Sequence, residues 1–226
     1  MLVDYPWPEK FPFTARDFRR LDEGADASFY SAPRMVTHID AGAIAALSAF
    51  YADALPASGG DEDVAILDLC SSWLSHLPEG YAAHRIVGLG MNAHELGENA
   101  QLTEFVVRDL NVDPTLPFQA ASFDAVVNAV SVDYLTDPLA VFREICRVLK
   151  PGGKAIMSFS NRYFATKVIR AWRTTRDRDH ILIAASYFHY AGGFDAPQAM
   201  DISQGHKGDP MYVVFATKAA RGGAQA

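Results

Sequence analysis

Polar side chains, with their immediate neighbours in the sequence, follow four apolar stretches of the chain, at the points where those stretches end. They are Asp68 with Cys70, Ser71 and Ser72; Met91 with Asn92; Asp109 with Leu110; and Asn128. Carboxylates, hydroxyls and amides are suited to hold the hydroxyl, amine and carboxylate groups of a ligand. Any single group is equally well explained as an ordinary turn. Four such groups at one sheet edge would instead predict a binding pocket.

A second set of side chains could act on a bound substrate, by accepting a proton or by forming a wall. The candidate catalytic residues are Tyr30, His38, Tyr134 and His189. The structural alternative for His38 is a surface position beside a helix that Asp40 caps. The aromatic neighbours of His189 are more often core than substrate wall, and Tyr134 could simply belong to a hydrogen-bonded loop.

Other reactive residues favour structural readings. His76 and His84 lack the Cys and His clustering of a zinc site, so no metal is expected. Cys70 could act as a nucleophile with a lowered pKa, but a buried and unreactive cysteine is the better interpretation. The basic run between positions 162 and 178 is usually a solvated helix face; the alternative is attraction of an anionic acceptor or a partner.

The elements that would position these residues alternate between strands and helices. Five short apolar runs predict buried parallel strands, namely Val64–Asp68, Arg85–Leu89, Glu104–Val107, Phe123–Val127 and Lys154–Ser158. Helices are predicted from Asp40 to Leu55, from Asp137 to Leu149 with Pro151-Gly152-Gly153 as the stop, and from Asp179 to Tyr190. Met211–Thr217 is expected as a closing antiparallel strand. This rhythm predicts a doubly wound α/β sheet, with ligands at the carboxyl ends of its strands.

Composition limits the functional classes. The 226 residues are 50% hydrophobic and 21% charged, as in one globular domain. A formal net charge of −7 argues against nucleic acid as a partner, and the apolar stretches are too short to span a membrane. Two cysteines and the absence of a signal-peptide pattern favour a cytoplasmic location, although an organelle after removal of a transit peptide stays open.

The chain resembles the class I S-adenosylmethionine-dependent methyltransferases, of the type 11 kind, from about Val64 to Lys218. Three segments carry the resemblance, namely Ile66-Leu67-Asp68-Leu69, Asp109 with the later Ser122-Phe123-Asp124, and Arg147-Val-Leu-Lys-Pro-Gly-Gly153. The resemblance implies a Rossmann-like fold with a mostly parallel seven-stranded sheet whose last strand is antiparallel. It implies S-adenosylmethionine as cofactor, with Asp109 at the adenine amine.

Two departures from the family pattern affect the cofactor loop. The glycines expected after the first strand are replaced by Cys70, Ser72 and Leu74, and the acid expected at the end of the second strand is Gly90. Ser71, Ser72 and Asn92 are the expected substitutes, since hydroxyls and amides can donate hydrogen bonds. The bulky residues from Ser71 to His84 predict a short or distorted first helix.

The domain prediction is a single methyltransferase-like domain. Residues 1–60 would form an irregular and helical lid, 61–218 the Rossmann-like core and 219–226 a tail. The predicted function is methyl transfer to a small-molecule acceptor. The alternative is a catalytically silent protein of the same fold that serves as a binding or interaction module. A nicotinamide-dependent oxidoreductase is disfavoured because the first loop lacks Gly-x-Gly-x-x-Gly.

Overall fold

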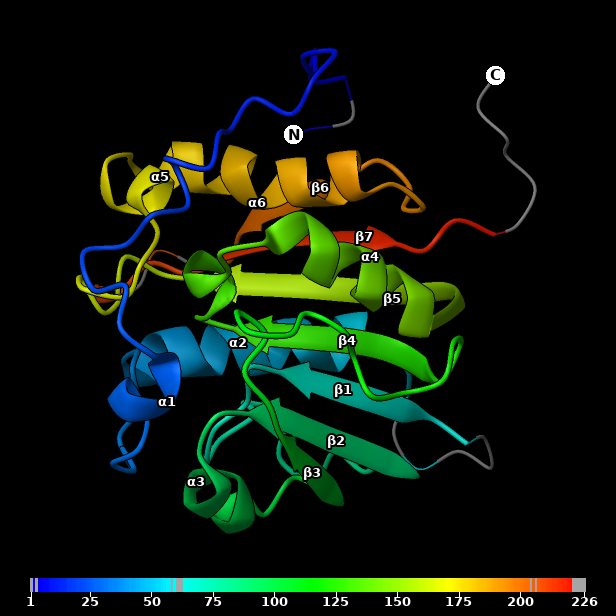
Figure 1. Cartoon of the computed structure of the whole chain (residues 1–226). Helices are drawn as coiled ribbons and strands as arrows, with labels where there is room; N and C mark the ends of the chain where they lie inside the picture. The colour runs from blue at the N-terminus through cyan, green and yellow to red at the C-terminus, as the bar shows by residue number, and fades with distance from the viewer. Residues whose placement is uncertain are drawn as a thin grey trace.

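The computed structural model describes residues 2, 4–57, 59, 63–203, 205 and 207–220. Seven strands form one sheet in the order β3-β2-β1-β4-β5-β7-β6 (Figure 1). Their bounds are β1 (Ala65–Leu69), β2 (Arg85–Gly90), β3 (Glu104–Val107), β4 (Phe123–Ala129), β5 (Leu149–Phe159), β6 (Gln198–Asp201) and β7 (Tyr212–Thr217). Strands β1 to β5 run parallel, whereas β7 is antiparallel to both β5 and β6. The predicted α/β class and the antiparallel closing strand are confirmed. Strand β6 was not predicted from the sequence.

The helices lie on both faces of the sheet, with α2 behind it and α4 and α6 in front (Figure 1). They are α1 (Asp26–Phe29), α2 (Ala41–Ala54), α3 (Ala93–Glu98), α4 (Pro138–Val148), α5 (Arg170–Arg173) and α6 (Asp177–Ala191), with a 3₁₀ turn η1 (Val132–Tyr134). The side chain of Asp40 caps α2 by accepting from the Ala43 N–H at 2.8 Å, and Asp137 caps α4. Gly192, with a φ of 77°, ends α6.

Two helix predictions were wrong. Residues 70–84 contain no helix, because the loop after β1 is held by contacts to its neighbours rather than by its own turns. The segment Pro151-Gly152-Gly153 does not stop α4, which already ends at Val148 and passes directly into β5. Leu149 already pairs with Phe123 of β4, and Pro151 to Gly153 form an irregularity of the strand before regular pairing resumes at Lys154. There Gly152 and Gly153 exchange backbone hydrogen bonds with Lys218.

Alternate residues of the central strands face opposite helices, so the sheet has a core on each side. Leu67, Val126 and Met157 pack with the α4 and α6 side chains, whereas Ile66 and Val127 pack with α2. Burial on both faces explains why these strands are continuous apolar runs in the sequence.

The segment before α2 crosses the molecule and ends at the strand carboxyl ends. It runs over α6, where the Phe11 ring lies 5.3 Å from that of Tyr190, and then descends to α1 (Figure 1). There Asp26 is bound by Arg20, with Nη1 2.7 Å from Oδ2, and by Lys167, with Nζ 3.0 Å from Oδ1. This cluster fixes α1 against the segment that follows β5.

Lys167 belongs to the basic run that was expected as a helix face, yet it is only 1% exposed. In the first half of that run only Arg170–Arg173 is helical, and Lys167 and Arg170 pair with Asp22 and Asp17. Arg162, Arg176 and Arg178 are exposed, as expected for solvated cations, and Arg162 also pairs with Asp209.

Among the described residues, no helix is both long and apolar enough to cross a membrane, and no group of three His, Cys, Asp or Glu side chains could hold a metal ion. The end of the expected tail, residues 221–226, lies outside the described residues.

Candidate active site

A cavity of about 330 Å³ lies at the carboxyl ends of the parallel strands, covered by the segment from Tyr30 to His38. Most of the residues singled out in the sequence line it, namely Tyr30, His38, Asp68, Cys70, Ser71, Ser72, Met91, Asn92, Asp109, Leu110 and Tyr134. The size suits a small organic ligand. The sheet edge predicted from strand rhythm is therefore where the structure places the cavity.

Two predicted site residues lie elsewhere. Asn128 is fully buried beneath the first loop, where its amide donates to the Leu69 carbonyl at 2.8 Å. His189 is on α6 and stacks on Trp7, with ring centroids 5.0 Å apart, so it does not line the cavity. The aromatic surroundings of His189 are thus packing contacts, the reading that its spacing favoured.

The loop after β1 is stabilised by contacts of its own serines. Ser71 Oγ donates to the Asp68 carboxylate at 2.5 Å, and the Ser71 N–H donates to the Leu89 carbonyl. Burial raises the pKa of Asp68 to about 7, although the hydroxyls of Ser71 and Ser75 oppose the shift. Both donors of Ser71 are therefore used within the protein, in contrast to the expectation that its hydroxyl would bind cofactor.

Backbone strain gathers around the cavity. Cys70, His76 and Val130 have φ values of 58°, 57° and 45°, a region that residues with a Cβ rarely adopt. All three line the cavity. Such strain costs on the order of 1–3 kcal/mol per residue and concentrates at functional sites. Burial, followed by the Asp68 charge, raises the pKa of the Cys70 thiol to about 12, which makes it a poor nucleophile.

The end of β2 has no room for the acid that the family resemblance implies. A Cβ on Gly90 would lie 2.1 Å from the Ser71 carbonyl oxygen. The loop after β1 therefore lies directly over the end of β2, and only glycine fits there.

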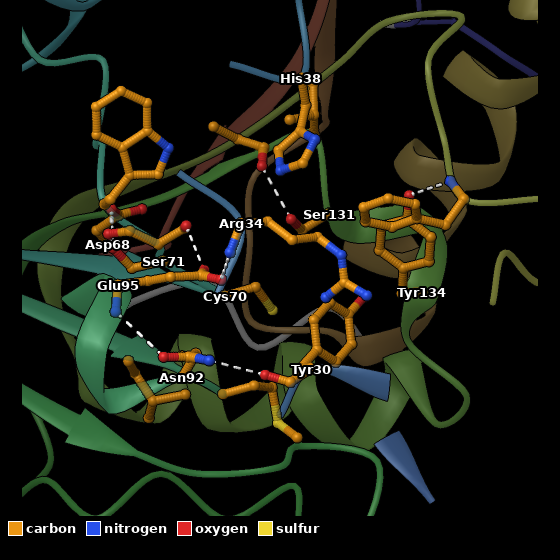
Figure 2. A pocket seen from close by; sticks show the side chains of 18 of the residues that line it. Tyr30, Arg34, His38, Asp68, Cys70, Ser71, Asn92, Glu95, Ser131 and Tyr134 are labelled. Atoms are coloured by element: carbon orange, nitrogen blue, oxygen red, sulfur yellow. Dashed lines mark hydrogen bonds between the residues drawn. The ribbon is translucent and has the colours of Figure 1, made fainter. Parts of the chain in front are cut away.

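Side chains from α3 and its N-cap hold the covering segment in place (Figure 2). Glu95 accepts from the Arg34 N–H at 2.7 Å and from Ser72 Oγ at 2.6 Å. Asn92 donates to the Tyr30 and Ser31 carbonyls, and its oxygen caps α3 by accepting two backbone N–H groups. All hydrogen-bonding capacity of Asn92 is thus occupied, which leaves none for the ribose role expected of it.

The loop after β3 joins the cavity to α1. Asp109 Oδ1 accepts from the Asn111 N–H at 2.9 Å, and the Asn111 amide donates to Asp26 and to the Tyr134 carbonyl. Asp109 therefore has a fixed orientation, with carboxylate capacity left for a ligand.

The other end of the cavity is aromatic. Phe164 lies at the centre, with its ring centroid 5.4 Å from His38, 6.0 Å from Tyr134 and 6.4 Å from Tyr30. The Tyr134 hydroxyl accepts from the Phe164 N–H at 2.7 Å, and burial raises the pKa of that hydroxyl well above its ordinary value. The Tyr134 hydroxyl therefore stays protonated, and the Tyr134 ring forms part of the cavity wall.

Four residues line the cavity although they were not predicted as site residues, namely Trp73, His76, Glu95 and Phe164. Trp73 lines the cavity and donates from Nε1 to the Val36 carbonyl at 3.0 Å. The available signal was their position: Trp73 and His76 lie in the loop after β1, and Glu95 lies three residues beyond Asn92.

Residues 50–157 match a protein-family model described as a methyltransferase domain. The malonyl-[acyl-carrier protein] O-methyltransferase of Hahella chejuensis is 28% identical over 133 residues, 56% of this chain and 47% of that protein. A ubiquinone biosynthesis O-methyltransferase of Xanthomonas oryzae pv. oryzae is 43% identical over 56 residues, 24% of this chain and 23% of that protein. The chain thus spans less than half the length of these curated relatives.

Solved structures share the fold at low identity. A SAM-dependent methyltransferase from Aquifex aeolicus superposes with a TM-score of 0.55 at 13% identity, over 86% of this chain and 97% of the other. The [4+2]-cyclase SpnF superposes with a TM-score of 0.57 at 16% identity, over 86% of this chain and 92% of the other. The same fold therefore occurs in a methyltransferase and in a cyclase.

Proposed function

We propose that this chain, which belongs to the class I S-adenosylmethionine-dependent methyltransferase superfamily, transfers a methyl group from that cofactor to a small-molecule acceptor. The observation that supports it most is the cavity at the carboxyl ends of β1 to β4, which is lined both by carboxylates, such as Glu95 and Asp109, and by aromatic rings, such as Phe164. Ligands of open α/β sheets bind at this edge.

The residues present suit the cofactor in an altered arrangement. Asp109 and Leu110 would hold the adenine, because both line the cavity at the end of β3. Glu95 would take the ribose hydroxyls, since its two oxygens accept one hydrogen bond each and retain further lone pairs. The backbone from Cys70 to Ser72 would border the methionyl part.

The cofactor supplies a methyl group bound to a positively charged sulfur. When the methyl group is transferred, that sulfur is left as a neutral thioether. The protein then has to bring the acceptor atom into line with that methyl group and exclude water. The segment from Tyr30 to His38 closes the cavity, and its contacts to Asn92, Glu95 and Trp73 join it to the loops that would hold the cofactor. Tyr30, Tyr134 and Phe164 would position the acceptor.

Calorimetric titration with S-adenosylmethionine and S-adenosylhomocysteine tests this proposal. Binding of both is expected, and Asp109→Asn and Glu95→Gln should each weaken it roughly tenfold, as loss of a charged hydrogen-bond partner does. Asp53→Asn and Glu98→Gln are the matched controls, because both carboxylates are exposed on helices away from the cavity. No binding at millimolar cofactor would contradict the proposal.

A binding or interaction module without transfer activity is the second candidate. The position of the Ser71 carbonyl favours it, since that oxygen takes the place of the family's ribose-binding acid. The likeness to a cyclase supports it further, because this fold carries other activities. Binding of cofactor without methyl transfer to any acceptor would favour this second function.

A further inference from the structure

The acceptor end of the cavity has a wall of aromatic rings and two imidazoles. His38 packs edge-on against Phe164 at an interplanar angle of 76°, and His76 lies in the loop after β1 on the same cavity. Among the described residues neither imidazole has a hydrogen-bond partner. Both can therefore bond to a ligand.

The arginines that line the cavity already have partners. Arg34 donates from Nη2 to the Phe29 carbonyl at 2.8 Å, and its guanidinium carbon lies 4.5 Å from the Phe29 ring centroid. Arg108 is paired with Asp113, and Arg162 Nε lies 2.7 Å from Asp209 Oδ1. None of these three arginines is therefore left without a partner to bind an anionic acceptor.

The carboxylates that line the cavity are equally engaged. Asp26 is bound by Arg20 and Lys167, and Asp68 by Ser71. Glu95 and Asp109 lie at the end assigned to the cofactor. What remains for the acceptor is an apolar aromatic slot with two free imidazoles.

These imidazoles are neutral at physiological pH. Burial and then the nearby Arg34 charge hold the pKa of His38 below its ordinary value, although Glu95 opposes the shift. Burial and then His38 lower the pKa of His76 to about 4. A neutral imidazole has one nitrogen lone pair that can take a proton.

We propose that the acceptor is an uncharged aromatic hydroxyl compound, bound against Phe164 and Tyr134, and that His38 accepts its proton. This inference rests on the proposed methyl transfer and assigns the substrate class of that site. His38 is the better base of the two, because Glu95 favours its charged form, whereas His76 is too weakly basic and stays neutral beside it.

The transfer balances as follows in atoms and electrons. The hydroxyl proton passes to the His38 lone pair while an oxygen lone pair forms the new bond to the methyl carbon. The bond between that carbon and sulfur breaks, and its electron pair stays on sulfur. His38 is exposed on its outer side and then releases the proton to water.

Four probes with the same ring size test the substrate class, namely 4-methylcatechol, 4-nitrocatechol, benzoate and benzylamine, each with S-adenosylmethionine carrying a labelled methyl group. Transfer to the catechols is expected, with little to benzoate or benzylamine. His38→Gln should lower kcat for 4-methylcatechol roughly 100-fold. The loss should be much smaller for 4-nitrocatechol, assayed below its own pKa so that it too is uncharged, because its more acidic hydroxyl needs less help from a base. His84→Gln is the matched control, because His84 is exposed before β2.

Binding supplies a readout that does not depend on turnover. Trp73 lines the cavity, so quenching of its fluorescence by 4-nitrocatechol in the presence of S-adenosylhomocysteine reports occupancy. His38→Gln should leave this Kd within about threefold, since a proton acceptor acts on kcat.

The inference is overturned by transfer to benzoate or benzylamine in preference to the catechols, by cofactor binding with no transfer to any probe, or by an equal effect of His38→Gln on both catechols. Failure of the proposed function looks different, because the protein would then not bind S-adenosylmethionine at all, and the inference would fall with it.

Discussion

The carbonyl oxygen of Ser71 lies where a side chain at position 90 would begin, 2.1 Å from the place that a Cβ on Gly90 would occupy. Because the Ser71 N–H also bonds the Leu89 carbonyl, the loop after β1 is fixed over the end of β2. The two departures from the family pattern, in the first loop and at the end of β2, are therefore one structural change.

Gly90→Ala should destabilise the protein by about 1–3 kcal/mol, the usual cost of forcing an atom into a packed site. Gly97→Ala is the matched control on α3, where an added Cβ meets nothing within 4 Å. It should stabilise the protein by about 0.5–1 kcal/mol, because alanine is the better helix former. Urea unfolding measures both, and equal effects of the two substitutions would contradict the Ser71 contact.

Cys70→Gly should give a protein about 1 kcal/mol more stable than Cys70→Ala. Both variants remove the thiol, but only glycine adopts a φ of 58° without a Cβ penalty. Comparing the two variants separates backbone strain from side-chain packing. Denaturant midpoints that coincide would mean that the left-handed conformation at this position stores no strain.

Stability should fall as pH rises from about 6.5 to about 8. Below that window the histidines, whose pKa values burial lowers in the folded protein, act in the opposite sense. Asp133 in η1 is 2% exposed and its Oδ2 has no partner among the described residues, so burial raises its pKa from 3.8 to about 8. The pKa of Asp68 is raised to about 7 for the same reason. In this window the unfolded chain has already lost protons that the folded protein keeps, so higher pH favours unfolding. Thermal melts across this range measure the slope.

Asp133→Asn keeps the shape of the side chain and removes its titration. The variant should lose part of the pH slope and exceed the wild type in stability at pH 8 by about 1 kcal/mol or more. Asp53→Asn, on the exposed side of α2, should keep the wild-type slope. An unchanged slope in Asp133→Asn would show that this carboxyl is ionised in the folded protein.

Lys167→Met should destabilise the protein by about 3–5 kcal/mol, because it leaves Asp26 with one buried cation fewer. The double variant Lys167→Met with Asp26→Asn should recover part of that loss, since the carboxylate charge is then gone as well. Lys10→Met, at an exposed position, is the control and should change stability by less than about 0.5 kcal/mol. Strictly additive losses in the double variant would argue against a direct interaction.

The strand rhythm determined most of the fold. Continuous apolar runs such as Val64–Leu67 are typical of strands buried on both faces, and their alternation with helices predicts a parallel sheet. The helix caps Asp40 and Asp137 could also be predicted from the sequence, because capping is a local interaction. Strand β6, with one buried residue among its four, had no such pattern.

The sequence by itself also determined which sheet edge holds the site, because parallel strands bring their carboxyl ends together. Only the tertiary structure decided what the residues there do. Asn92 was expected to bind a ligand and instead caps α3 and holds the covering segment. Glu95 and His76 line the cavity although the sequence had not predicted them there. The reason is that hydrogen-bond partners such as Arg34 and Ser72 come from distant parts of the chain. The spacing of residues in the sequence does not predict those contacts. The glycine at position 90 is likewise explained only by the Ser71 carbonyl oxygen, which leaves no room for a side chain there.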